Sequence, residues 1–303
     1  MVNGIILGIA TALLQSLSYL ASGYFIRKHD SALKLLITSH VAMGIISAAL
    51  MPFFWNMEML ELHGTVWWCL GIWILMFMLG QAGFFISQKL IEPSRLASLL
   101  GLKIVVLSLI WILFVHQWLN FLQIIGVILS VSAAFVMNWS GGRKFELKSL
   151  LPLAVTLVCY SLTDLSETTM VLLCDQGNIV RAGISVTLLC YTVLGICSLP
   201  LLVKTGWNIK MQCHALPFSL LWLGSQMTLL ICFGLIGPVF GNVIQSSRGL
   251  FSVIFGVVVC RLGFDVMEKS ASGKLWLRRA LAALLMIGGI ACFSFGKIIA
   301  GIS

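Results

Sequence analysis

The sequence contains few charged residues. Only 10% of its 303 residues are Asp, Glu, Lys or Arg, against roughly 25% in soluble domains. Hydrophobic residues make up 60% of the chain, and the mean hydropathy is +1.06, so polar side chains are too few to cover a water-soluble globule. This composition excludes large extramembrane enzymes and nucleic-acid-binding modules, and it predicts an integral membrane protein.

The sequence also lacks the short motifs of several catalytic and binding sites. No glycine-rich loop with GKS/T is present to cradle phosphate, so we expect no direct hydrolysis of ATP. The HExxH and CxxC metal spacings and the GxSxG nucleophile elbow are absent as well. The nine cysteines are odd in number and fall mostly inside apolar runs, as small buried hydrophobes do. We therefore expect a protein that is not an enzyme and has no cofactor and no metal.

Long apolar runs fill nearly the whole chain. Each is long enough to cross about 30 Å of hydrocarbon as an α-helix that rises about 1.5 Å per residue. The runs occupy residues 3–26, 33–55, 65–90, 93–116, 121–139, 149–172, 179–203, 214–236, 238–260 and 275–299. The sequence therefore predicts an all-α integral membrane protein with ten transmembrane helices. The first run lacks a basic leader and a cleavage site, so we interpret it as a retained span.

Basic residues are distributed unevenly between the predicted loops. Fifteen of them lie in the odd-numbered loops, whereas only Arg181 and Lys297 lie on the opposite side. Because Lys and Arg hold loops in the cytoplasm, we expect cytoplasmic odd-numbered loops and external termini. The same bias accounts for the net charge of +9. We therefore expect the lipid bilayer to be the partner of these basic residues, and we expect no nucleic-acid partner.

An internal repeat organises the chain. Three residues of the first half recur 145 positions later: Gln81, Pro93 and Lys103 correspond to Gln226, Pro238 and Arg248. The same offset aligns Ser16 with Ser161. Each half has an odd number of predicted spans, five, so the second half would enter the membrane upside down relative to the first, as in secondary transporters. We predict two inverted five-helix repeats, residues 1–140 and 141–303.

With this helix number, this duplication and a glycine-rich last helix at 288–296, the sequence resembles the drug/metabolite transporter superfamily and its EamA-type members. The resemblance covers essentially the whole chain and implies transport of a small molecule. Within the superfamily, the triose-phosphate translocator branch is similar in carrying basic residues on the fourth and ninth helices, the predicted helices of Lys103 and Arg248. The resemblance therefore implies that these two residues hold an anion.

Lys103 and Arg248 lie near the middle of their predicted spans, and Asp164 and Glu167 lie three residues apart on one face of the sixth span. A charge at the bilayer centre costs about 2.5 to 3.5 kcal/mol on insertion scales, and such residues usually face a cavity or the bundle interior. We interpret the two basic residues as substrate-binding groups, with neutralisation by the carboxylates as a purely structural alternative. Asp164 is a candidate for substrate binding or for carrying a coupling ion, and Glu167 is a second coupling candidate.

Uncharged polar residues complete the predicted site. Gln81 and Gln226 are duplicated amides, Tyr19 belongs to a polar cluster in the first span, and Gln245 lies on one helical face with Arg248. Each could donate hydrogen bonds to a substrate, although bonding between helices is an equal alternative.

Together these features favour a secondary transporter, an exporter or exchanger of a small anionic or zwitterionic metabolite such as an amino acid or an organic phosphate. The expected location is the bacterial inner membrane, with a homodimer as one possible assembly. Two alternatives stay open at this point: a flippase for a lipid-linked anion, and a membrane protein with a structural or assembly role that does not transport.

Overall fold

A computed structural model describes residues 1–55, 64–91, 96, 99–110, 112–113, 118–138, 150–205, 208–261 and 273–299. Every regular element in these ranges is helical. The elements are α1 (Val2–His29), α2 (Ala32–Phe54), α3 (Gly64–Leu90), the 3-10 turn η2 (Leu100–Leu102), α5 (Lys103–Ile110), α6 (Phe121–Asn138), α7 (Leu150–Leu173), α8 (Ile179–Thr205), α9 (Ile209–Ile236), α10 (Pro238–Gln245), α11 (Arg248–Arg261) and α12 (Gly273–Ile299).

Within the described residues, six helices are long and apolar enough to cross a membrane: α1, α2, α3, α7, α8 and α9. Two shorter apolar helical stretches lie at Leu100–Ile110 and Phe121–Ala133. The prediction of an all-helical, multi-pass membrane protein is therefore confirmed. The predicted run 93–116 lies partly outside the described residues, including Pro93.

The predicted ninth span, 238–260, is not one continuous helix. The structure divides it into α10 and α11 at a turn formed by Ser246 and Ser247. Gly249 and Leu250 close this turn by donating to the backbone oxygens of Ser246 and Ser247. The fourth span has a comparable irregularity, since η2 comes directly before α5. Arg248 and Lys103 are consequently the first residues of the helical segments that follow the two breaks.

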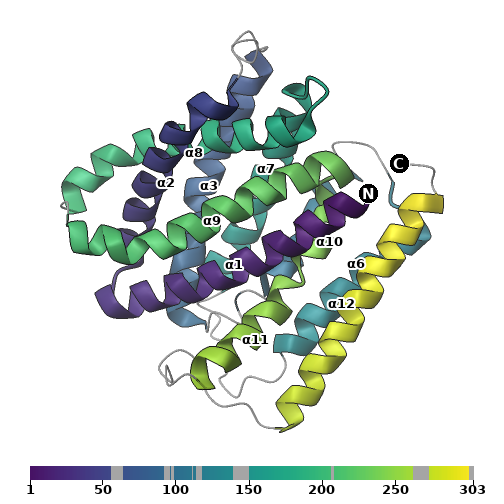
Figure 1. Cartoon of the computed structure of the whole chain (residues 1–303). Helices are drawn as coiled ribbons and strands as arrows, with labels where there is room; N and C mark the ends of the chain where they lie inside the picture. The colour runs from purple at the N-terminus through teal and green to yellow at the C-terminus, as the bar shows by residue number, and fades with distance from the viewer. Residues whose placement is uncertain are drawn as a thin grey trace.

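The helices pack in pairs that join distant parts of the chain. α1 lies along α9, α3 along α7, α2 along α8 and α6 along α12. Figure 1 shows α1 and α9 side by side in the middle of the molecule, and α6 with α12 at one edge. The α2–α8 pair is especially close, because a Cβ added to Gly44 would lie 2.6 Å from the Cα of Gly195. Such close helix contacts through small residues are typical of membrane proteins.

Apolar and polar side chains are arranged as expected for a protein surrounded by lipid. Large apolar residues are exposed on the outside, among them Trp68 at 78% and Val203 at 85%. Many hydroxyl and amide side chains are instead buried among the helices. The structure describes the side chains of eight cysteines, and none of these forms a disulfide. Four are buried as the sequence interpretation expects, two are half-buried, and Cys197 and Cys213 are exposed.

Candidate functional site

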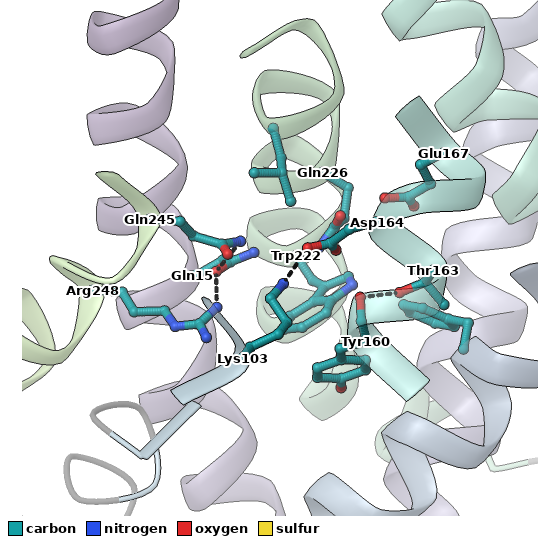
Figure 2. Close-up of a pocket in the computed structure, with 12 residues that line it drawn as sticks. Gln15, Lys103, Tyr160, Thr163, Asp164, Glu167, Trp222, Gln226, Gln245 and Arg248 are labelled. Atoms are coloured by element: carbon teal, nitrogen blue, oxygen red, sulfur yellow. Dashed lines mark hydrogen bonds and ion pairs between the residues drawn. The ribbon is translucent and has the colours of Figure 1, made fainter. Parts of the chain in front are cut away.

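A polar cavity lies between the helices where the two helix breaks meet α1, α7 and α9. Figure 2 shows its lining, which consists of Gln15, Phe77, Lys103, Tyr160, Thr163, Asp164, Glu167, Trp222, Gln226, Leu229, Gln245 and Arg248. The space open to the centre of a water-sized molecule is about 20 Å³, whereas a single water needs roughly 10 to 15 Å³ by this measure. In this conformation the cavity has room for water and is too small for a metabolite.

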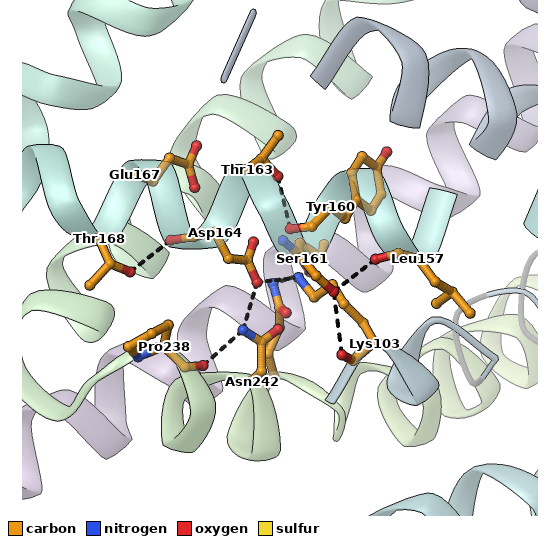
Figure 3. Close-up of polar contacts among 12 residues, drawn as sticks. Lys103, Leu157, Tyr160, Ser161, Thr163, Asp164, Glu167, Thr168, Pro238 and Asn242 are labelled. Atoms are coloured by element: carbon orange, nitrogen blue, oxygen red, sulfur yellow. Dashed lines mark hydrogen bonds and ion pairs between the residues drawn. The ribbon is translucent and has the colours of Figure 1, made fainter. Parts of the chain in front are cut away.

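Lys103 forms a buried ion pair with Asp164. Lys103 Nζ lies 2.7 Å from Asp164 Oδ2, and both side chains are about 95% buried. The same oxygen accepts a hydrogen bond of 2.6 Å from Asn242 Nδ2 (Figure 3). Asn242 also donates to the backbone oxygen of Pro238, which fixes its amide. Asp164 is thus held by one cation and one amide, and the charge of Lys103 is neutralised within the protein.

Arg248 is buried to the same extent but has different partners. It is 3% exposed, and its Nη1 donates to Gln15 Oε1 at 2.9 Å. Gln245 Nε2 donates to the same oxygen at 3.0 Å. Arg248 Nε is buried without a hydrogen-bond partner, and among the described residues no carboxylate lies within 4.0 Å of the guanidinium group. Gln15 supplies only a neutral dipole, so the positive charge of Arg248 has no counter-ion in the described part of the chain.

An aromatic ring lies near each cation. Lys103 Nζ is 6.0 Å from the centre of the Tyr160 ring, and the guanidinium carbon of Arg248 is 6.0 Å from the centre of the Tyr19 ring. These distances are at the outer limit of cation–π attraction. Both tyrosine hydroxyls are buried and have no hydrogen-bond partner among the described residues, so each could donate to water or to a ligand.

Glu167 lies one helical turn beyond Asp164 on α7 and also lines the cavity. Trp73 Nε1 on α3 donates to its Oε1 at 2.5 Å. Glu167 is 3% exposed, and no basic nitrogen of the described residues lies within 4.0 Å of its carboxyl group. The burial of Glu167 agrees with the prediction that this residue faces the bundle interior. Its hydrogen-bond partner there is the indole of Trp73.

Serines that correspond in the repeat bind backbone on opposite halves of the chain. Ser16 Oγ in α1 lies 2.8 Å from the backbone oxygen of Arg248. Ser161 Oγ in α7 lies 3.4 Å from the backbone oxygen of Lys103. Each half of the sequence therefore contributes a hydroxyl to the helix break of the other half.

The structure gathers most of the residues singled out from the sequence. Lys103, Arg248, Asp164, Glu167, Gln226 and Gln245 all line the cavity. Tyr19 lies outside this lining but faces Arg248. Gln81 is fully buried outside the lining, with neither amide atom hydrogen-bonded.

Sequence reasoning missed several lining and supporting residues. Asn242 precedes Gln245 by three positions and so shares its helical face, which could have indicated its place. Tyr160 could have been found as the residue 145 positions after Gln15. Trp73 and Trp222 carried no such signal, because their indoles look the same in sequence as interfacial anchors. In the described residues, no three His, Cys, Asp or Glu side chains are grouped so that they could hold a metal ion.

These features define a multi-pass membrane protein with a charged cavity enclosed by its helices. Residues 2–139 match the model of the EamA-like transporter family. This match covers a little under half of the chain, and it supports a relation to the drug/metabolite transporter superfamily and a general role in transport. The EamA-like family is a family of transporters and not of enzymes.

Two further comparisons concern curated proteins and solved structures. No curated protein matches the chain. One protein of known crystal structure is similar with a TM-score of 0.62 and 18% sequence identity, over 95% of this chain and 94% of the other. At that identity the likeness concerns the fold alone.

Proposed function

We propose that this transporter carries a small organic anion or zwitterion across the membrane, and that Arg248 binds the negatively charged group of the substrate. The observation that carries the proposal is the unpaired positive charge of Arg248 in the cavity wall. A buried ion without a counter-ion is costly in a protein interior or a membrane. An anionic ligand would offset that cost.

The ion pair of Lys103 supports this choice of residue. Because Asp164 already neutralises Lys103 at 2.7 Å, Lys103 has less attraction left for a second anion. Lys103 and Asp164 would then orient the cavity wall, while the free hydroxyls of Tyr19 and Tyr160 and the amide of Gln226 would donate to neutral parts of the substrate.

We also propose that residues 1–140 and 141–303 are inverted five-helix repeats and that transport proceeds by alternating access between them. Three observations support this. Lys103 and Arg248 are 145 residues apart and both follow a helix break. α1 packs on α9 as α7 packs on α3, and Ser16 and Ser161 bind backbone of the opposite half. Discontinuous helices at the interface of inverted repeats commonly form transporter binding sites.

The small size of the cavity fits such a cycle. With room for little more than water, the described conformation would be an occluded state without substrate. Substrate would enter only after one repeat rocks against the other and opens the cavity to one side.

The test combines ligand screening with removal of the Arg248 charge. The purified chain is screened by thermal shift against amino acids, organic phosphates and nucleosides, and each compound that stabilises it is followed as a radiolabelled substrate in proteoliposomes. Wild-type protein should be stabilised by an anion or zwitterion. Arg248→Gln should stay folded and lose that stabilisation, with affinity at least about tenfold weaker, since hydrogen bonds to charged groups contribute about 1.5 to 3 kcal/mol.

Arg278→Gln is the matched control, because Arg278 is an exposed arginine on α12 outside the cavity lining. It should bind and transport as the wild type does. Wild-type transport by Arg248→Gln, or stabilisation only by uncharged nucleosides, would contradict the assigned role of Arg248.

A further inference from the structure

We propose that Glu167, and not Asp164, is the carboxyl group of the cavity that binds and releases a proton, and that its protonation gives the cavity the net positive charge that an anion needs. The inference rests on the proposed function for its physiological meaning. Its test needs no ligand, so either proposal can fail alone.

Asp164 is held by an ion pair and by a hydrogen bond from an amide. Its Oδ2 accepts from the Lys103 ammonium group at 2.7 Å and from Asn242 Nδ2 at 2.6 Å. A proton on that oxygen would remove both contacts and leave the Lys103 charge unpaired in the interior. Asp164 therefore serves as the counter-ion of Lys103.

Glu167 has no such support. Its one hydrogen bond in the described residues comes from the neutral indole of Trp73, and no described basic nitrogen is within 4.0 Å. An indole can donate to a carboxylate oxygen and also to the carbonyl oxygen of a protonated carboxyl group. The site therefore accommodates Glu167 in both states, and the cavity beside it has room for a water molecule that would carry the proton.

The titratable groups that face Glu167 come from several helices. Asp164 lies on the same helix, Lys103 faces it from α5, and Cys190 and Tyr191 face it from α8. Arg248 lines the same cavity from α11. From α3, α9 and α10 the neighbouring polar groups are neutral: Trp73, Trp222, Gln226, Asn242 and Gln245.

The charge balance of the cavity gives this proton a function. With both carboxylates ionised, they balance Lys103 and Arg248, and the cavity is neutral. With Glu167 protonated, one positive charge remains, and it belongs to Arg248 because Asp164 neutralises Lys103. Anion and proton should therefore bind together, with tighter anion binding as the pH falls through the titration of Glu167.

Infrared difference spectroscopy on the full chain in liposomes, without ligand, tests the assignment. Spectra are recorded from about pH 5 to about pH 10, the range in which buried carboxyl groups titrate. The wild type should show a C=O band of a protonated carboxyl group that disappears at high pH. Glu167→Gln should remove the band, whereas Asp164→Asn should retain it. Trp73→Phe should move the band to higher frequency, because a hydrogen bond weakens a C=O bond.

Asp175→Asn is the control for general carboxyl effects, since Asp175 is exposed in the loop after α7. It should leave the band unchanged. The assignment would be overturned if the titrating band survives in Glu167→Gln or is lost in Asp164→Asn, or if the wild type shows no such band. Because Glu167→Gln could change packing, its circular-dichroism spectrum and thermal unfolding, measured without ligand, serve as the folding check and should match those of the wild type.

Discussion

Lys103 and Arg248 occupy equivalent positions in the sequence repeat, yet their surroundings differ in charge. Each is the first residue after a helix break, about 97% buried, with an aromatic ring 6.0 Å away. Asp164, in the second half of the chain, forms an ion pair with Lys103. The repeat equivalent of Asp164 in the first half is Tyr19, and this tyrosine lies near Arg248. Duplication preserved the place of the cation, and divergence at one position decided whether the cation is neutralised.

The largest expected effect comes from removing the neutralised cation. Lys103→Gln leaves the Asp164 carboxylate buried without a cation, which should lower the free energy of unfolding by about 3 to 5 kcal/mol. Adding Asp164→Asn should restore most of the loss, because no buried charge is then left unpaired. Thermal or denaturant unfolding of the wild type, Lys103→Gln and the double variant measures this.

Arg248→Gln serves as the contrast in the same measurement. It removes a charge that has no described counter-ion, so it should not destabilise the protein as Lys103→Gln does. Equal destabilisation by the two substitutions would show that Arg248 is neutralised within the protein, and the difference between the two cations would disappear.

The second prediction makes the two environments alike. Tyr19 is the repeat equivalent of Asp164. The substitution Tyr19→Asp therefore places a carboxylate near Arg248, and this carboxylate should form an ion pair with the guanidinium group. Ligand affinity should fall at least about tenfold, or about 1.4 kcal/mol, as the anion loses its cation.

Tyr19→Asn is the control for the lost ring. It has the same size as the Asp variant and no charge, so any cost of the cavity left by Tyr19 is common to both. Binding isotherms in detergent compare them. If both variants bind equally weakly, the ring and not the charge of the cation determines affinity.

The smallest effect concerns the two serines that bind backbone across the repeats. Ser16→Ala should destabilise by about 0.6 kcal/mol, a typical value for a hydrogen bond between membrane helices. Both serines also contact a carbonyl of their own helix. Ser161→Ala should cost less, because its oxygen is 3.4 Å from the Lys103 carbonyl, whereas that of Ser16 is 2.8 Å from the Arg248 carbonyl. Paired unfolding curves measure the difference, and a larger loss for Ser161→Ala would contradict it.

Much of the fold could be predicted because apolar run length alone separates membrane helices from other segments. The bounds of α1, α2 and α3 agree with the predicted spans to within a few residues. The division at Ser246 and Ser247 was not predicted, because apolar residues continue on both sides of the polar stretch 245–248 and make one run long enough for a single span. Tertiary contacts of the break, such as Ser16 with the Arg248 carbonyl, stabilise it. Gln81 shows a related limit, since the repeat indicated a cavity position that its packing does not give it.

The sequence by itself determined the membrane setting, the duplication and the equivalence of Lys103 with Arg248, because these depend on composition and spacing along one chain. Only the tertiary structure decided which cation is paired. Electrostatic attraction depends on distance through space and on local solvation, and the residues concerned lie 61 positions apart for Lys103 and Asp164, and 233 for Arg248 and Gln15. No spacing along the chain indicates that the first pair meets as two ions at 2.7 Å while the second joins a cation to a neutral amide.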